Sequence, residues 1–388
     1  MQSDVIVAID IGAGQGTRVG LFRNPATLLE ERYFSLGEYG GDYGSFLGRV
    51  TGEIQGLLAL RKNEPLRAIG IATPGVLQGD GGFKWVQNIP FLEGANLKND
   101  LAGAFGVSVG VANDADAGAL AEWSVLRIDL LYWVFGGGWG GAWVTADGEL
   151  MFPSTDWDGR DSSLHYTNEP GVSVPLEKIV LKELFAEIGA SYDRLERILD
   201  EEFGDDEEHR LGPGGDSETL RAETILSGPG RCRLFRAVVG DDDFYERFLD
   251  IHESKEMSDP TVAGKHISKL SSMRVEAAVN TDRLYGKILA QATRTLIKAA
   301  KSDGLPEGIP ICLGGKPSYA LPYFGPSAQR MLGRMGLMNY LRPSIVDERG
   351  LNANLVGAAV VADQAERLGR SVAGQTSPVR GRAPAEAV

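Results

Sequence analysis

The spacing of apolar residues in the first third of the chain predicts alternating strands and helices. The segment "DVIVAID" (4–10) is apolar at nearly every position, as expected of a central strand that is covered on both faces. Three strands in a meander, followed by a strand, a helix and a strand, predict a mixed sheet with helices packed on it. The other predicted strands are "TRVGLF", "RYFSL", "LRAIGIA" (66–72) and 106–112, and the predicted helices are 43–62 and 96–105.

A strand that runs into a glycine cluster occurs a second time along the chain. In "IDLLYWVFGGGWGGAWVTADGELMF" (128–152), an apolar strand reaches the glycines, and a hairpin through Asp147-Gly148 follows. The two halves therefore begin with similar strand–turn–strand units, although no residue-by-residue repeat is present. The later part is predicted to be mainly helical over 175–300, with a long helix near 272–303, a strand at 309–315, and helices from about 327 and over 352–368.

Two polar segments stand outside this pattern. The acidic run "DEEFGDDEE" (200–208) is expected to be a solvated loop. Residues 371–388 are small, polar and proline-containing, and we expect them to be a flexible tail.

Composition limits the classes of partner. The chain has 388 residues, 43% of them hydrophobic, which is enough for two domains with separate cores. Its formal charge of −14 argues against nucleic acid or an anionic membrane as a partner, whereas backbone amides and a metal can still hold phosphates. The two cysteines, Cys232 and Cys312, are far apart in sequence, and no apolar run is long enough to span a membrane. We expect a cytoplasmic protein without a signal peptide.

The first glycine turn has the chemistry of a phosphate-binding hairpin. "DIGAGQGTRVGLF" (10–22) lacks the Lys-Ser/Thr pair of a P-loop, and a strand rather than a helix follows it, which excludes the dinucleotide-binding pattern. Glycines let a polyphosphate approach the backbone amides, and Asp10 at the rim is a candidate ligand for Mg²⁺. An ordinary glycine-rich turn is the alternative. A second turn, "FGGGWGG" (135–141), favours phosphate binding, and "CLGGKP" (312–317) is a candidate floor for an adenosine.

One predicted strand ends on two polar residues, Asn113 and Asp114, and a helical stretch follows. A carboxylate at a strand end is held rigidly, as a catalytic group requires, although a helix cap is the alternative for Asp114. Asp116 is interpreted as a first-turn helix residue that the helix dipole stabilises.

The order of these motifs resembles the sugar kinases of the actin, hexokinase and heat-shock-protein-70 ATPase superfamily. The resemblance is strongest to bacterial glucokinases and the ROK (repressor, open reading frame, kinase) family, and it covers about residues 4–365. Its specific parts are the Asn-Asp stretch within "VQNIPFLEGANLKNDLAGAFGVSVGVANDADAGALAE" (86–122) and "AETILSGPGRCRLFRAVVG" (222–240). "IGIATPGVL" (69–77) and "LNANLVGAAVVA" (351–362) are also similar, whereas the glycine turns alone are common.

The resemblance implies an α/β fold of two ribonuclease-H-like (actin-like ATPase) domains with a cleft between them. Each domain is expected to hold a mixed five-stranded sheet flanked by helices. The small domain is expected over 1–113 together with about 352–370, and the large domain over 114–351 with an acidic insertion near 196–220. ATP and Mg²⁺ as cofactors, a sugar or sugar-like substrate and a homodimer are also implied.

The resemblance assigns roles residue by residue. Asp114 matches the base that accepts a proton from the sugar hydroxyl, and a weak base suffices because positioning and charge neutralisation supply most of the rate in phosphoryl transfer. Asp10 is expected to hold the metal. The expected sugar-binding residues are Asn88, Asn113, His165, Glu223 and Glu177. The expected nucleotide-binding residues are Gly12, Gly14, Gln15, Gly16, Thr17, Gly137, Gly138, Gly140, Gly314 and Gly315.

Three glutamates compete for one place in the sugar pocket. Glu223 ranks first because the flanking "SGPG" fixes its register, Glu177 stands where ROK proteins have their pocket glutamate, and Glu196 is the third. Plain structural roles remain the alternatives for Glu223, for His165 and for both asparagines.

The chain departs from the family pattern at several positions. Trp139 replaces the threonine that contacts a phosphate, which puts ordinary phosphate handling in doubt. Ser162 replaces the glutamate of the Glu-x-x-His sugar clamp that ends at His165, and the zinc-binding cysteines of ROK proteins are absent. The first glycine motif is one residue longer, and the chain between His165 and Glu223 is longer too. A lost carboxylate at 162 predicts an amino sugar (kanosamine or glucosamine) or a cyclitol rather than glucose.

These features together predict an ATP-dependent hexose 6-phosphotransferase with Asp114 as its base. A sugar- or nucleotide-binding regulator on the same fold, with catalysis lost, is the alternative, and a phosphohydrolase is the third. Two features favour the kinase. Asp10 and Asp114 are both in place, and no DNA-binding helical extension is expected before residue 4.

Overall fold

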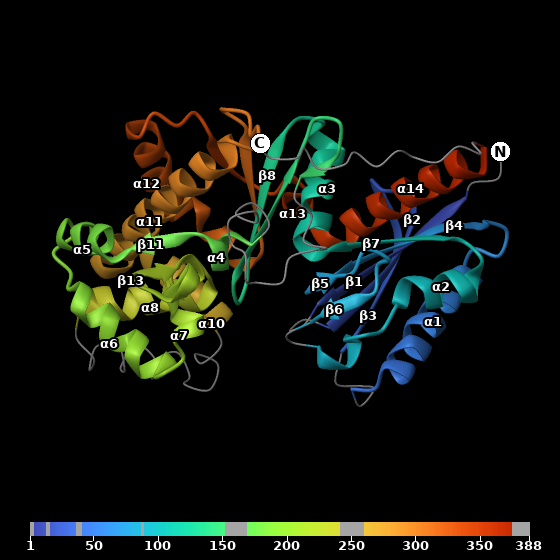
Figure 1. Ribbon diagram of the computed structural model, residues 1–388, viewed down its shortest axis with the longest axis horizontal. Helices are drawn as coiled ribbons and strands as arrows, with labels where there is room; N and C mark the ends of the chain where they lie inside the picture. The colour runs from blue at the N-terminus through green and yellow to red at the C-terminus, as the bar shows by residue number, and fades with distance from the viewer. Residues whose placement is uncertain are drawn as a thin grey trace, which may run out of the picture.

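The computed structural model describes residues 4–12, 16–35, 41–86, 89–151, 169–240 and 260–374. Two lobes lie side by side, each built on a five-stranded sheet (Figure 1). The first sheet has the order β3-β2-β1-β4-β7, with β1 Val5–Gly12, β2 Gly16–Asn24, β3 Thr27–Phe34, β4 Leu66–Thr73 and β7 Ser108–Asn113. The second has the order β10-β9-β8-β14-β15, with β8 Leu130–Phe135, β9 Trp139–Val144, β10 Leu150–Met151, β14 Pro310–Gly314 and β15 Tyr340–Pro343.

Both sheets have the same topology. In each, three strands form an antiparallel meander, and two further strands then add in parallel to the first strand of that meander. The predicted mixed sheets and the similarity of the two halves are therefore confirmed. The predicted domain limits, at 113/114 and 351/352, stay a prediction.

Two helices pack between the sheets. These are α3 Asp114–Leu126 and α14 Ala353–Gly374, and one hydrophobic cluster joins them to β1 and β4 on one side and to β8 and β9 on the other (Figure 1). The packing is close because small residues face it: a Cβ on Gly357 of α14 would lie 1.8 Å from the carbonyl oxygen of Ala117 in α3. A larger side chain at 357 would push these two helices apart.

The outer faces of the two sheets have separate cores. Helices α1 Tyr43–Ala59 and α2 Leu97–Phe105 cover the first sheet. The second sheet is covered by α11 Glu276–Lys301 and α12 Leu321–Arg334, with a helical layer beyond them made of α5 Lys178–Ala186, α6 Tyr192–Phe203, α8 Gly228–Val239 and α10 Pro260–Ser272. Among the described helices, none is long and apolar enough to cross a membrane.

Several short elements were not predicted from the sequence. A three-stranded sheet of β11 Pro175–Glu177, β13 Asp216–Arg221 and β12 Leu211–Gly212 lies within the segment predicted to be mainly helical. The other short elements are β5 Val76–Leu77, β6 Phe83–Trp85, α4 Pro170–Ser173, α7 Glu207–Arg210 and α13 Ile345–Glu348.

The prediction of a loop at the acidic run 200–208 was wrong. Residues 200–203 complete α6, and 207–208 begin α7, although their side chains are solvated as expected. The helix forms because the face that bears Leu195, Ile198 and Leu199 is buried, while arginines of α8 and α7 pair with the acids on its exposed face. The predicted helix from about 327 begins earlier, at Leu321.

Candidate active site

The strand β7 and the helix α3 meet at the Asn113-Asp114 pair. The Asn113 side-chain oxygen caps α3 by accepting from the Ala115 N–H at 2.9 Å, and its amide donates to the Gly75 carbonyl at 3.0 Å. The Asp114 carboxylate also accepts from the Ala115 N–H, at 2.8 Å. Asn113 is thus the cap, and Asp114 is the first helical residue with its position fixed by the cap. A role of Asn113 toward a sugar stays a prediction.

Asp114 and Asp10 lie at the same end of the first sheet, because β1, β4 and β7 are parallel and their carboxyl ends align. Burial raises the pKa of Asp114 to about 6, although the Ala115 N–H acts in the opposite direction. Burial, followed by the charge of Asp114, raises the pKa of Asp10 to about 7. Each carboxyl is therefore within electrostatic reach of the other in a poorly solvated place.

The two carboxylate oxygens of Asp10 differ in their hydrogen bonding. Its Oδ2 accepts from the side-chain amide of Asn352 at 3.1 Å, and hydrogen bonding from the side chains of Asn354 and Asn352 lowers the pKa of the carboxyl against the effect of burial. Its buried Oδ1 has no partner within hydrogen-bond distance in the described part of the chain. A buried carboxylate oxygen without a donor fits a cation, and Mg²⁺ prefers oxygen ligands. Since no three metal-ligating side chains gather among the described residues, phosphate oxygens and water would have to complete the coordination of Mg²⁺.

A carboxyl that the sequence analysis missed, Glu169, lies close to Asp114. Burial and then the charges of Asp114, Glu223 and Asp116 raise its pKa well above the ordinary glutamate value. It directly precedes α4, in the order Glu169-Pro170-Gly171-Val172. Alignment of the Glu-x-x-His clamp on its histidine, His165, places Ser162 at the position of the glutamate. Aligned on the glutamate instead, the same spacing starts at Glu169 and ends at Val172.

Of the three competing glutamates, Glu223 faces this group. Its carboxylate lies against the second glycine turn, since a Cβ on Gly138 would be 2.6 Å from Oε2, and it accepts a hydrogen bond from the Trp139 backbone N–H. Glu177 is exposed at the end of β11. Glu196 is held by Arg210 at 2.6 Å and by Lys178 at 3.2 Å on the outer helical layer.

The second glycine turn is built from backbone, and Trp139 does not obstruct it. The Trp139 side chain is 1% exposed and packs in the core edge-on against Trp133, with 4.9 Å between ring centroids. The Gly228 N–H at the start of α8 donates to the Gly136 carbonyl at 2.9 Å. Gly137 is exposed, and Gly138 and Gly140 are half-buried, so their amides lie near the surface while the indole lies beneath.

The first glycine turn is described only at its two ends. Gly12 ends β1, and Gly16 and Thr17 begin β2, while Gly14 and Gln15 lie outside the described residues, as do Asn88, Ser162 and His165. Gly16 has φ +76°, and a Cβ there would be 2.5 Å from the Phe34 carbonyl oxygen, so the turn requires glycine. The Thr17 hydroxyl is buried without a partner among the described residues.

The third glycine pair contacts the second turn. A Cβ on Gly315, which has φ +78°, would lie 2.0 Å from the Phe135 carbonyl oxygen, at the residue where the "FGGGWGG" turn starts. The Asp347 carboxylate accepts from the backbone N–H groups of Gly315 and Ala353. Because Ala353 starts α14 and Asn352 binds Asp10, hydrogen bonds run from this glycine pair to the candidate metal ligand.

A second buried glutamate supports this connection from the side of α3. The fully buried Glu122 accepts from the Ser344 hydroxyl at 2.5 Å and from the backbone N–H groups of Ile345 and Val346 at 3.0 and 3.1 Å. It therefore fixes α13, the short helix that carries Asp347, to the helix that begins with Asp114. The sequence signal for this residue is a lone glutamate on an alanine-rich helix.

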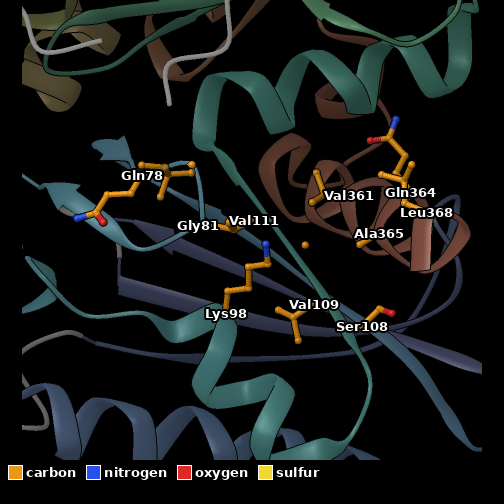
Figure 2. A pocket seen from close by; sticks show the side chains of 13 residues that line it. Gln78, Gly81, Lys98, Ser108, Val109, Val111, Val361, Gln364, Ala365 and Leu368 are labelled. Carbon is orange, nitrogen blue, oxygen red and sulfur yellow. The ribbon is translucent and has the colours of Figure 1, made fainter. Parts of the chain in front are cut away.

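Charge interactions link Asp10 with Asp114, and Glu169 with both Asp114 and Glu223, next to the three glycine segments. We call these four residues the acidic pocket, although within the described residues no three of them lie close enough together to hold one metal ion. Glu177 is not among them. A recess in the described part of the chain lies elsewhere, at the edge of the first sheet (Figure 2), and no residue of the acidic pocket lines it.

No protein-family model matches the chain. Kanosamine kinase of Amycolatopsis mediterranei (strain S699) is 33% identical over 141 residues, which are 36% of this chain and 45% of that protein. A ROK-family glucokinase from Streptomyces griseus, solved with glucose and AMPPNP, superposes with a TM-score of 0.60 over 93% of this chain and 99% of its own, at 16% identity. The chain has the fold of the ROK sugar kinases.

This finding confirms the predicted α/β class and the resemblance at the level of the fold. The ROK fold alone does not separate enzymes from regulators. A ROK-family transcriptional regulator, a homologue of the E. coli MLC protein, superposes with a TM-score of 0.62 over 94% of this chain and 78% of its own, at 18% identity. The activity must therefore be argued from the residues of the acidic pocket.

Proposed function

We propose that the chain is an ATP-dependent sugar kinase that transfers the γ-phosphoryl group of Mg-ATP to a hydroxyl of a hexose or hexose-like substrate. The observation that carries the proposal is the pair of desolvated carboxyls, Asp10 and Asp114, together with the second glycine turn, whose Gly140 lies against Ala115 and whose Gly137 is exposed. One carboxylate of such a pair can bind a metal ion, and the other can accept a proton. By analogy with the family we also propose a homodimer.

In the proposed reaction, Asp114 takes the proton of the sugar hydroxyl. The new bond joins the sugar oxygen to the γ-phosphorus, and the bond from that phosphorus to the bridging oxygen breaks, leaving its electron pair on ADP. With a pKa of about 6, Asp114 is mostly ionised at pH 7 and is a stronger base than an ordinary aspartate. Mg²⁺ bound at Asp10 would neutralise charge on the phosphate oxygens.

The charge of the acidic pocket favours an amino sugar. Glu169 lies near both Asp114 and Glu223, and desolvation raises the pKa of both glutamates, although Arg221 and His209 lower that of Glu223. A positively charged group beside Glu169 would therefore be stabilised. The protonated amine of an aminohexose supplies such a group. The similarity of part of the chain to a kanosamine kinase supports the same substrate class. We therefore propose an aminohexose, phosphorylated at the 6-hydroxyl.

The test is ADP release from Mg-ATP across a panel of hexoses, aminohexoses and cyclitols. Kanosamine or glucosamine is expected to give the highest kcat/KM, and N-acetylglucosamine, whose amide carries no charge, is the matched control. If glucose were clearly preferred, the amino-sugar proposal would be wrong, but the proposed kinase activity would still hold. If no sugar raised ADP release above that with water, the regulator would become the better hypothesis.

A pair of matched variants tests which glutamate contacts the sugar. Glu223→Gln is expected to raise the KM for the sugar about tenfold or more, because a hydrogen bond to a charged group is worth about 1.5–3 kcal/mol. Glu177→Gln, at an exposed position, should leave KM within about twofold. Steady-state kinetics of both variants decide the matter, and the reverse ranking would move the pocket to Glu177.

A further inference from the structure

An open recess of about 470 Å³ lies at the edge of the first sheet (Figure 2), and none of its lining residues belongs to the acidic pocket. Its walls come from the edge strand β7, the turn between β5 and β6, the start of α2 and the C-terminal half of α14. Small-molecule sites in proteins have volumes of about 300–1,000 Å³, so the recess has the size of a ligand site.

Lys98 is the one ionisable side chain among the residues that line the recess. It is half-buried at the start of α2, and its Nζ lies beside Gly81 and Val111 of the recess (Figure 2). Within the described residues no carboxylate pairs with it. In a chain with a formal charge of −14, a recess with one positive and no negative side chain is complementary to an anion.

The remaining walls select for an apolar body. Beside Gln78, Ser108 and Gln364, most of the other side chains of these walls are aliphatic, namely Leu77, Val109, Val111, Val361, Ala365 and Leu368. We propose that the recess binds a small carboxylate with an apolar body, whose carboxylate pairs with Lys98. One ammonium balances one carboxylate, whereas a phosphate monoester carries about −1.5 to −2 charges and would leave part of its charge uncompensated.

The position of the recess connects its occupant to the acidic pocket. A Cβ on Gly110 of β7 would lie 2.7 Å from the Val361 side chain of α14, so the strand and the helix touch beside the recess. The strand leads directly into Asp114, and the helix begins next to Asn352, which binds Asp10. A ligand wedged between them therefore acts on both carboxyls, and this consequence rests on the proposed kinase function.

Calorimetric titration with sodium octanoate tests the binding without reference to kinase activity. Saturable binding to the full chain is expected, with 1-octanol and octyl phosphate binding more weakly. Lys98→Met, which keeps the aliphatic stem, should weaken octanoate about 10- to 100-fold, and Ala365→Phe, which fills the recess, should abolish binding. Lys62→Met removes an exposed lysine elsewhere and should bind octanoate as the unaltered chain does.

The outcomes separate the parts of the proposal. Absence of octanoate binding, or equal binding by the Lys98→Met variant, would overturn the site, and tighter binding of octyl phosphate would overturn the assignment of a carboxylate. If the unaltered chain phosphorylates a sugar, octanoate should change kcat there and leave the Lys98→Met enzyme unaffected. Binding with no change in kcat would overturn the connection to the acidic pocket.

Discussion

Replacing Asp114 by asparagine is expected to lower kcat for sugar phosphorylation about 10²- to 10⁴-fold, the usual contribution of a positioned general base. Asparagine keeps the size of the side chain and can still accept from the Ala115 N–H, so α3 keeps its start. The amide cannot take the hydroxyl proton, and the KM for the sugar should change only a few-fold. The measurement is ADP release under saturating Mg-ATP and sugar.

The stability of the same variant separates lost chemistry from lost folding. The pKa of Asp114 is raised in the folded state, so its ionised form opposes folding at every pH above the unfolded value near 3.8. The Asp114→Asn variant is therefore expected to melt at a higher temperature than the unaltered chain at pH 7. Asp100→Asn, at an exposed first-turn position of α2, is the control and should keep kcat. If kcat of the Asp114→Asn variant stayed near the native value, Asp114 would not be the general base.

Local patterns sufficed to predict the first sheet and the strand-to-helix junction at 113–114. The continuous apolar run of β1 reflects a strand that is buried on both faces, and the Asn-Asp pair reflects a cap followed by a first-turn acid. These features depend on neighbours within a few residues. They can therefore be seen in one sequence without knowledge of the fold.

The missed residues depend on contacts between distant segments. Glu169, Asp347 and Glu122 gain their meaning from partners on other strands and helices, and no local periodicity marks them. The doubt over Trp139 has a similar origin. The sequence shows it inside a glycine turn, but it is the first residue of β9, where the pleat directs its side chain into the core.

The second large effect is expected in the dependence of the rate on pH. Both Asp10 and Asp114 must be ionised, one for the metal and one for the proton, and burial raises their pKa values to about 7 and about 6. Activity should therefore fall as the pH is lowered through this range, by about a thousandfold from pH 8 to pH 5 at low Mg²⁺, since one group is then about 1% ionised and the other about 10%. An ordinary aspartate would lose activity only near pH 4.

Magnesium should move this acid limb, because the ion binds the carboxylate and competes with its proton. At saturating Mg²⁺ the fall in rate is expected to occur at lower pH. It should then depend on the binding of about one proton instead of two, mainly that of Asp114. The measurement is kcat/KM from pH 5 to 8 at two MgCl₂ concentrations, one below and one above half-saturation. Asp10→Asn should abolish the dependence of the limb on Mg²⁺. If kcat/KM fell over the same pH range at both MgCl₂ concentrations, Asp10 would not be a ligand of the metal.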